Sequence, residues 1–386
     1  MGIGRSAAPA ARSAAAEATG AALAQGDAKL LIVFCSELYD LPELLATINE
    51  RSGGVPLIGC STAGEIATDG PGDGGVVVVS FGGAGFGVST AAATDASAGL
   101  RQAGAAVARY SNDDPERPYR LLLLLTDGLA GDQQEIVRGA YSELGAEVPL
   151  VGGCAGDDLK MKATSQLHGD RVLTNAVVAA AIASDAPFGI GVHHGWRKVG
   201  EPMLVTSSSA NRVSRLDDRP ALDVYLERLD APEEAWIDAE AFTRFALTHP
   251  LGLSRRSGEN VRFVAGTDFA DRSLGCIAEV PQGALAWMME GDAASVLDAT
   301  DAACRDALEP LGDRRALGLI AFDCIARKGV LAGHGRAGEG IAAEVQRIAA
   351  HAGGAPVAGF YTYGEIARTA GMSGFHNQTL VILAVS

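Results

Sequence analysis

The sequence predicts an α/β fold with two domains, built from repeated βαβ-type units whose mixed sheets are flanked by helices. The chain has 386 residues, more than one ordinary hydrophobic core serves. Short apolar runs, typical of buried strands, alternate with stretches whose apolar residues recur at helical spacing. A shared layout of strand, helix and strand also occurs three times, which indicates an internal repeat.

The first 27 residues are rich in alanine and contain no acidic residue before Glu17. They lack the continuous apolar core of a secretory signal, so we expect residues 1–27 to form a frayed tail leading into a short helix. The two predicted domains cover residues 28–215 and 216–386.

Each repeated unit contains an apolar strand, a polar turn, a crossover helix and a second short strand that ends at a glycine. Parallel strands need such a crossover, so each unit is predicted to be a βαβ unit. A further apolar segment follows each unit, which predicts mixed sheets. The first strands are 30–35, 121–125 and 317–322; the helices 42–50, 133–144 and 339–350; the second strands 56–59, 149–152 and 356–359; the further strands 76–81, 172–182 and 379–385.

The pattern becomes helical between residues 211 and 252, where we place the junction between the domains. Apolar residues at helical spacing carry this prediction, namely Leu222, Tyr225, Leu226 and Leu229.

Composition excludes several classes of function. The formal net charge of −16 disfavours nucleic acid and anionic membranes. The longest apolar stretch, residues 172–183, is too short and too interrupted to span a bilayer. The six cysteines form no C-x-x-C pair and suit a reducing compartment. We therefore expect a cytoplasmic protein that neither binds nucleic acid nor inserts into a membrane.

The glycine tails are the candidate sites, because ligands gather beyond the carboxyl ends of parallel strands. Residues 59–67 (GCSTAGEIA) and 359–367 (GFYTYGEIA) agree at six of nine positions. The middle tail, residues 152–158 (GGCAGDD), is a shorter variant that places a carboxylate just after its second glycine.

Carboxylates after these glycines could hold the amino group of a ligand, or could instead cap a helix or make a structural hydrogen bond. Tyrosine and threonine side chains add hydroxyls and flat apolar faces, although alternation along a strand lets only one of Tyr361 and Tyr363 face a pocket. His376 and Asn377 could line the same cavity or form a satisfied turn. The predicted ligand-binding residues are Thr62, Gly64, Glu65, Tyr361, Thr362, Tyr363, Gly364, Glu365, His376 and Asn377.

Other reactive side chains have simpler interpretations. Asp157 and Asp158 point to opposite sides of an extended segment, which favours a turn over an acid/base pair. Cys60 and Cys154 lack the sequence context of a nucleophile, which favours buried thiols.

His193 and His194 could ligate a haem iron, although neighbouring residues on a strand face opposite ways and allow at most one ligand. The chain contains no C-x-x-C-H attachment string, so we expect no cofactor and no metal, with haem as the alternative.

Six strings in order resemble the FIST N-terminal and C-terminal domains, over nearly all of the chain after residue 28. The resemblance places the FIST N-terminal domain at residues 28–215 and the C-terminal domain at 216–386. One departure is Asp218, where the family usually has glycine, so the turn before Pro220 could differ. The strings are residues 59–65, 152–158, 191–200 (GVHHGWRKVG), 216–229 (LDDRPALDVYLERL), 359–366 and 376–379 (HNQT).

The resemblance implies an intracellular sensor of a small ligand. FIST domains are often fused to histidine kinase, chemotaxis-receptor or cyclic-dinucleotide output modules. We find no such module in these residues, so we expect a separate histidine kinase or diguanylate cyclase/phosphodiesterase to read the signal. Some family members are similar to haem-containing nitric oxide sensors.

The leading hypothesis is a non-enzymatic sensor of an amino acid or similar polar metabolite, because no nucleophile and base accompany the repeated loops. The alternatives are a haem-based nitric oxide sensor, a cysteine-dependent enzyme, and a scaffold that binds its partner through the helical junction.

Overall fold

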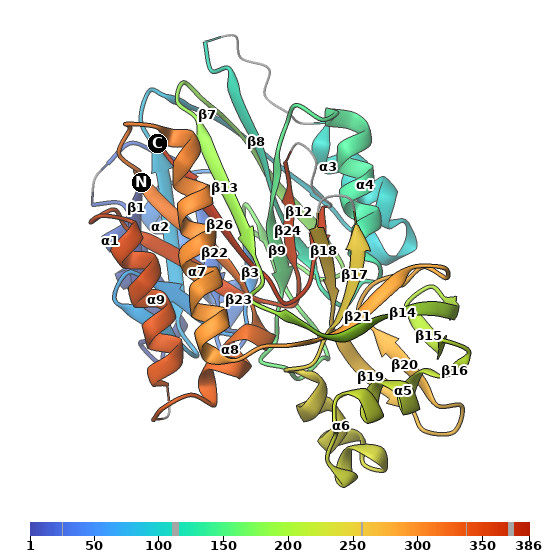
Figure 1. Cartoon of the computed structure of the whole chain (residues 1–386). Helices are drawn as coiled ribbons and strands as arrows, with labels where there is room; N and C mark the ends of the chain where they lie inside the picture. The colour runs from blue at the N-terminus through green and yellow to red at the C-terminus, as the bar shows by residue number, and fades with distance from the viewer. Residues whose placement is uncertain (25, 110–115, 256–257, 337, 370–373) are drawn as a thin grey trace.

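The computed structural model describes residues 1–24, 26–109, 116–255, 258–336, 338–369 and 374–386 (Figure 1). It confirms the predicted fold class: an α/β protein whose mixed sheets are flanked by helices. Three six-stranded sheets share one strand order. Each has an edge strand, an antiparallel neighbour, a parallel pair and a terminal hairpin. The orders are β1-β6-β2-β3-β10-β11, β7-β12-β8-β9-β24-β25 and β13-β26-β22-β23-β4-β5.

The first unit supplies the following elements: β1 (Gly2–Ser6), α1 (Ala11–Ala22), β2 (Ala28–Cys35), α2 (Leu41–Ser52), β3 (Leu57–Ser61), β4 (Glu65–Ala67), β5 (Gly70–Gly72) and β6 (Val76–Gly82). The second unit supplies β7 (Phe86–Ala93), the 3₁₀ turn η1 (Ala96–Ala98), α3 (Leu100–Ala108), β8 (Tyr119–Asp127), α4 (Gln133–Leu144), β9 (Leu150–Ala155), β10 (Gln166–His168), β11 (Arg171–Leu173) and β12 (Val177–Ser184).

The third unit is interrupted after its first strand. It consists of β13 (Phe188–His193) and, after the interruption, α7 (Ala293–Leu308), η3 (Glu309–Leu311), β22 (Gly318–Cys324), α8 (Ile325–Ala332), α9 (Glu339–His351), β23 (Val357–Thr362), β24 (Glu365–Arg368), β25 (Phe375–His376) and β26 (Leu380–Val385).

The three units exchange hairpins in a ring. The hairpin β4–β5 of the first unit pairs with β23 of the third, β24–β25 of the third pairs with β9 of the second, and β10–β11 of the second pairs with β3 of the first. Equivalent backbone bonds close each exchange: Tyr361 N donates to Gly64 O, Cys154 N to Gly364 O and Ser61 N to Ser165 O, at 2.9, 2.8 and 2.9 Å. The units therefore form a pseudo-threefold assembly within one chain, and strands from residues before and after 216 share sheets.

The central core lies between the inner faces of the three sheets. Inward-facing residues such as Phe34, Leu123 and Phe322 belong to one buried cluster, and the rings of Phe34 and Phe360 stack at 4.8 Å. The outward-facing residues of the same strands pack beneath the helices of their own unit. Both faces of each central strand are thus covered, which explains the continuous apolar runs in the sequence.

Small residues allow strands and helices to approach closely. A Cβ atom on Gly189 of β13 would lie 1.8 Å from the carbonyl oxygen of Ala307 in α7, and one on Gly4 of β1 would lie 1.9 Å from that of Ala18 in α1. Neither position accepts a side chain without moving the helix away.

The expected frayed tail at the N-terminus is wrong. Residues 2–6 form β1, which pairs with residues 76–80 of β6, and α1 packs against this strand. The segment is ordered because it completes the first sheet as its edge strand.

The interruption of the third unit is a segment with its own sheet, which projects beside the three-unit body (Figure 1). Its core includes Tyr225 and Phe242. Asp218 adopts the left-handed conformation, with φ +62°, so the turn still has the backbone shape that a glycine favours. The segment contains β14 (Arg197–Ser209), β15 (Arg212–Leu216), β16 (Arg219–Pro220), α5 (Ala221–Arg228), η2 (Glu233–Trp236), α6 (Ala239–Ala246), β17 (Leu251–Arg255), β18 (Gly258–Arg262), β19 (Val264–Asp268), β20 (Ser273–Cys276) and β21 (Leu285–Glu290).

Candidate functional site

The two repeated glutamates lie inside the protein. The Glu365 carboxylate accepts hydrogen bonds from the backbone N–H and the hydroxyl of Thr379, at 3.0 and 2.8 Å, and from the Thr362 hydroxyl. The Glu65 carboxylate accepts from the Thr62 hydroxyl at 2.6 Å and from Gly75 N at 2.9 Å. Burial raises the pKa of each carboxyl to about 7. Each carboxylate is therefore occupied by hydrogen bonds that stabilise the turn beside it.

The third copy of this position is Gln166, not Asp157 or Asp158 as the middle tail suggested. Gln166 pairs with Cys60 as Glu365 pairs with Gly153. Its side-chain oxygen accepts from Ala176 N at 3.2 Å and its amide donates to the Thr164 hydroxyl at 3.1 Å. A longer connection before β10 hides this equivalence in the sequence.

The other predicted ligand residues separate into buried and cavity-lining groups. Tyr361 is buried, with the Lys328 ammonium 4.6 Å from its ring centroid, whereas half-buried Tyr363 lines a cavity together with Asn377. His376 lies against the carbonyl oxygen of Ala367, 3.0 Å from its Nε2. The structure thus brings Thr62 to Glu65, and Thr362 to Glu365, as tightly bonded pairs.

The simpler interpretations of Asp157 and of the cysteines are confirmed. Asp157 accepts from the backbone N–H groups of Met161, Lys162 and Ala163, at 2.9, 2.7 and 3.1 Å, and so shapes a turn. Cys60 and Cys154 are free and buried.

The two histidines of the haem hypothesis are engaged by the chain itself. His193 lies on the surface with its Nε2 2.8 Å from the Asp306 carboxylate. The Nδ1 atom of His194 accepts a hydrogen bond from Trp196 N at 2.9 Å. Each of these ring nitrogens is thus already bonded within the chain, and neither residue lines the three cavities described below, so these donors do not fit a haem. Among the residues that the structure describes, no cluster of three His, Cys, Asp or Glu side chains could hold a metal ion.

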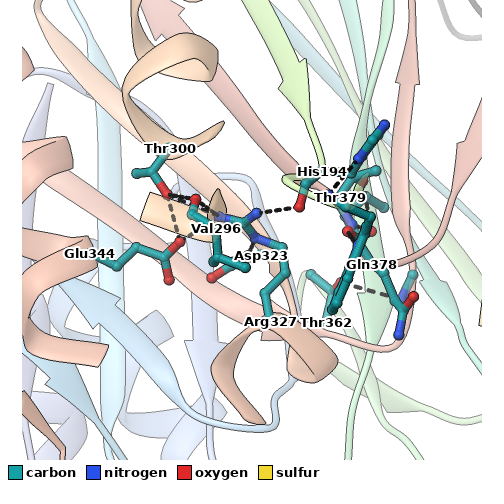
Figure 2. A network of polar contacts seen from close by, with 12 residues as sticks. His194, Val296, Thr300, Asp323, Arg327, Glu344, Thr362, Gln378 and Thr379 are labelled. Atoms are coloured by element: carbon teal, nitrogen blue, oxygen red, sulfur yellow. Dashed lines mark hydrogen bonds and ion pairs between the residues drawn. The ribbon is translucent and has the colours of Figure 1, made fainter. Parts of the chain in front are cut away.

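A buried polar network anchors the inserted segment to the body (Figure 2). The Arg327 guanidinium bonds to Asp323 at 2.8 Å and to Glu344 at 2.6 Å, and all three side chains are buried. Arg327 also donates to the carbonyl oxygen of His194 at 2.8 Å, where the chain enters the insertion. Burial, and next the Glu344 carboxylate, raise the pKa of Asp323.

A cleft of about 880 Å³ lies between the inserted sheet and the loop that follows β8. One wall comes from the body, from residues 128–138 around the start of α4. The other comes from the turn between β14 and β15, from β19 and β20, and from residues 277–279 after β20. A ligand in this cleft would touch both parts of the protein.

The body wall of the cleft is built by side-chain caps. Asp127 ends β8, and its carboxylate accepts from Leu129 N at 2.9 Å; Asp132 begins α4 by accepting from Gln134 N at 3.0 Å. Gln133 donates its amide to the Asp127 carbonyl at 2.8 Å. Its side-chain oxygen accepts no hydrogen bond in the described part of the chain, although the residue is buried.

Charges on the cleft lining are predominantly acidic. Asp132, Glu135 and Glu279 line it beside one basic residue, Arg138, which forms an ion pair with Glu135. This surplus of carboxylates favours a ligand that carries an amino group.

The cleft residues were not predicted from the sequence. The string from Gly128 to Asp132 did offer a signal, because a glycine-containing loop followed by a helix cap lies at the carboxyl end of a predicted strand. The opposite wall offered none, because it depends on where the inserted sheet packs.

Two smaller cavities adjoin the same loop. One, of about 270 Å³, is lined by Asp127, Leu129 and residues near β10 and β11. The other, of about 50 Å³, is lined by Gly128 and by further residues of the second unit, the third unit and the inserted segment. The described cavities therefore converge on the carboxyl end of β8.

Family models match the FIST N domain at residues 29–219 and the FIST C domain at residues 221–368. The chain belongs to the FIST family. FIST domains are small-ligand sensory domains of signalling proteins. The boundary between the two matches falls at the start of α5, within the inserted segment.

Several curated proteins are similar to this FIST protein. Uncharacterized protein Rv0628c of Mycobacterium tuberculosis is 26% identical over 390 residues, which cover 98% of this chain and 97% of that protein. Uncharacterized protein Mb0898c of Mycobacterium bovis is 26% identical over 283 residues, 72% of this chain and 69% of the relative. Uncharacterized protein MJ1623 of Methanocaldococcus jannaschii is 28% identical over 137 residues, 33% of this chain and 26% of the relative.

None of the helices in the described ranges is both long and apolar enough to cross a membrane.

Proposed function

We propose that this FIST protein senses a small polar ligand with an amino group, such as an amino acid, by binding it in the 880 Å³ cleft without catalysing a reaction on it. The observation that carries the proposal is the make-up of this cleft, with one wall on the three-unit body and the other on the inserted sheet. A bound molecule would bridge the two parts and stabilise their closed arrangement.

The lining supports this chemistry. Carboxylates of Asp132 and Glu279 attract an ammonium group, whereas Glu135 already pairs with Arg101 and Arg138. The unpaired oxygen of buried Gln133 is an acceptor for one of the ammonium protons. Arg138 offers a charge for a ligand carboxylate once it exchanges partners with Glu135.

Transmission is proposed to run through the attachment of the inserted segment. Arg327 holds the entry to the insertion through the His194 carbonyl (Figure 2). Gln378 donates to the carbonyl oxygen of Leu247 at 3.0 Å, just after α6. A shift of the inserted sheet on ligand binding would strain these bonds. A separate signalling protein, such as a histidine kinase or a diguanylate cyclase/phosphodiesterase, would read the changed surface.

Thermal-shift screening against a panel of L-amino acids and other small polar metabolites tests the proposal. A ligand at ten times its Kd should raise the melting temperature by roughly 2 °C. Gly266 lines the cleft, and a Cβ atom there would meet no atom within 4 Å, so Gly266→Phe should place a ring in the cleft and abolish the shift. The matched Gly266→Ala variant should keep it.

Ligand binding that survives Gly266→Phe unchanged would refute the cleft as the site. The Glu365→Gln variant tests the competing site, the glycine–glutamate turns. If Glu365→Gln loses ligand binding and Gly266→Phe keeps it, the ligand binds at those turns and not in the cleft.

A further inference from the structure

The 50 Å³ cavity lies at the carboxyl end of β22, separate from the ligand cleft although Gly128 and Ile277 line both. Its walls are mainly apolar and come from the body loops, from the inserted segment and from the start of α8. The apolar lining residues are Leu159, Met161, Leu247, Phe263, Ile277, Ile325 and Ala326.

One polar side chain in this lining is unsatisfied. Asn377 is 2% exposed, and within the described residues its Oδ1 atom has no hydrogen-bond partner. A buried acceptor without a donor is costly, and a ligand donor would remove that cost. The other polar side chains of the lining, Cys324 and Tyr363, are already engaged: the thiol donates to the Glu365 carboxylate and the Tyr363 hydroxyl donates to Asp157.

The pseudo-threefold symmetry marks this place as a recurring cavity. Asp127 N donates to Ala176 O in the second unit as Cys324 N donates to Thr379 O in the third, both at 3.1 Å. Counting back two residues from these acceptors makes Thr174 the counterpart of Asn377. Asp127 and Thr174 line the 270 Å³ cavity, so two units are hollowed at the same point, one with polar and one with mainly apolar walls.

A strained loop covers the apolar cavity. Leu159 and Met161 line it from residues 157–163 and adopt left-handed conformations, with φ of +61° and +52°. Their side chains remain 53% and 50% exposed, which leaves apolar surface at the mouth. The Tyr363 hydroxyl donates to Asp157 and accepts from Leu159 N at 2.6 Å, which fixes the loop. Such strain persists where surrounding contacts hold it, often at ligand clamps.

We propose that this cavity is a second binding site, for a small and mainly apolar molecule with one hydrogen-bond donor, such as a short aliphatic alcohol. The volume is about a third of a benzene-sized cavity of roughly 150 Å³, so about two non-hydrogen atoms of the ligand fill it and the others lie at its mouth, beside Leu159 and Met161. The alkyl part lies among the apolar walls, and the hydroxyl donates to Asn377 Oδ1. The ligand then contacts the body and the inserted segment together.

Fluorine NMR relaxation tests this site with two isosteric probes, 3-fluoropropan-1-ol and 1-fluorobutane. The folded full chain should broaden the alcohol signal, and bind the alcohol about five- to tenfold more tightly than the alkane, as one hydrogen bond predicts. Asn377→Leu should remove this preference while retaining weak binding of both probes. Ala326→Leu should fill the cavity and abolish binding of both; the same change at exposed Ala332, at the far end of α8, should leave it intact.

Absence of broadening in the wild-type protein, or equal binding of both probes, overturns the proposal. So does alcohol binding that survives folded Ala326→Leu. If Ala326→Leu loses its cooperative melt, Asn377→Leu decides, because it replaces the amide by the same number of non-hydrogen atoms and removes the acceptor. An unchanged preference for the alcohol would then refute the site. Gly266→Phe should not affect either probe, which separates this site from the ligand cleft.

Discussion

Gln166 occupies in the second unit the position that Glu365 occupies in the third. Each side chain accepts a hydrogen bond from the backbone N–H that opens its unit's last strand, and each bonds to a threonine hydroxyl nearby. Glutamine has the shape and hydrogen-bonding pattern of a protonated glutamate. The comparison indicates that these positions primarily support turns, with a neutral side chain preferred in the buried setting.

Glu365→Gln should therefore be tolerated and should reduce the pH dependence of stability. Burial raises the pKa of Glu365 from 4.5 to about 7, so the folded state binds the proton more tightly than the unfolded state does. The protonated Glu365 side chain therefore contributes to the free energy of unfolding fully below pH 4.5, and this contribution is lost as the pH rises to about 7. The loss is about 3 kcal/mol over this window. Urea denaturation at pH 4.5 and pH 8 should show a smaller difference for the variant than for the wild type.

The reciprocal change, Gln166→Glu, introduces a carboxyl group into an equally buried position. It should cost about 3 kcal/mol at pH 8 and much less at pH 4.5, measured by the same denaturation. Equal costs at both pH values would contradict the equivalence of the two positions.

Arg327→Met should destabilise the protein by about 3–5 kcal/mol, because it leaves Asp323 and Glu344 buried without their counter-charge. Arg347, whose side chain is 38% exposed beside Asp301, provides the matched control. Arg347→Met should cost no more than about 1 kcal/mol. Denaturant unfolding of the two variants measures both values, and similar costs would argue against the buried pair as an anchor.

Asp157→Ala should loosen the loop of residues 157–163, since three backbone N–H groups lose their acceptor. Hydrogen exchange measured by mass spectrometry should accelerate in peptides that cover this loop, by roughly tenfold or more for about 1.4 kcal/mol of lost local stability. Exposed Asp170, in the turn between β10 and β11, is the control, and Asp170→Ala should leave the exchange unchanged.

Cysteine labelling should separate Cys324 from the deeply buried thiols. Burial raises the pKa of Cys154 to about 12 and likewise raises that of the other cysteines, so thiolates are scarce in the folded state. All six thiols should resist a bulky reagent at pH 8 and react fully in denaturant. With the small reagent methyl methanethiolsulfonate, Cys324 should react before Cys60 and Cys154, because it lines a cavity. Mass spectrometry of partial digests identifies the first site, and initial labelling of Cys60 would contradict the packing of the core.

The repeated βαβ units could be predicted because each signature is local. Apolar runs such as residues 121–125 are covered on both faces, and helices such as α4 begin at an aspartate cap. Strands and helices can therefore be predicted from about a dozen consecutive residues. The candidate site was less predictable. The repeated glutamates were visible as a string, but whether their carboxylates faced a ligand or the chain's own N–H groups depended on neighbours far away in sequence.

By itself, the sequence determined the α/β class, the three repeats and the internal duplication of the glycine–glutamate turns, because periodicity and turn chemistry act over short distances. Only the tertiary structure decided which sheet each hairpin joins, since a short strand such as β4 offers the same backbone groups to any open edge. That choice places Glu65 beside Phe360 and Gln166 beside Cys60. Tertiary structure also determined the position of the cleft, because its second wall forms only where the inserted sheet packs against the loop after β8.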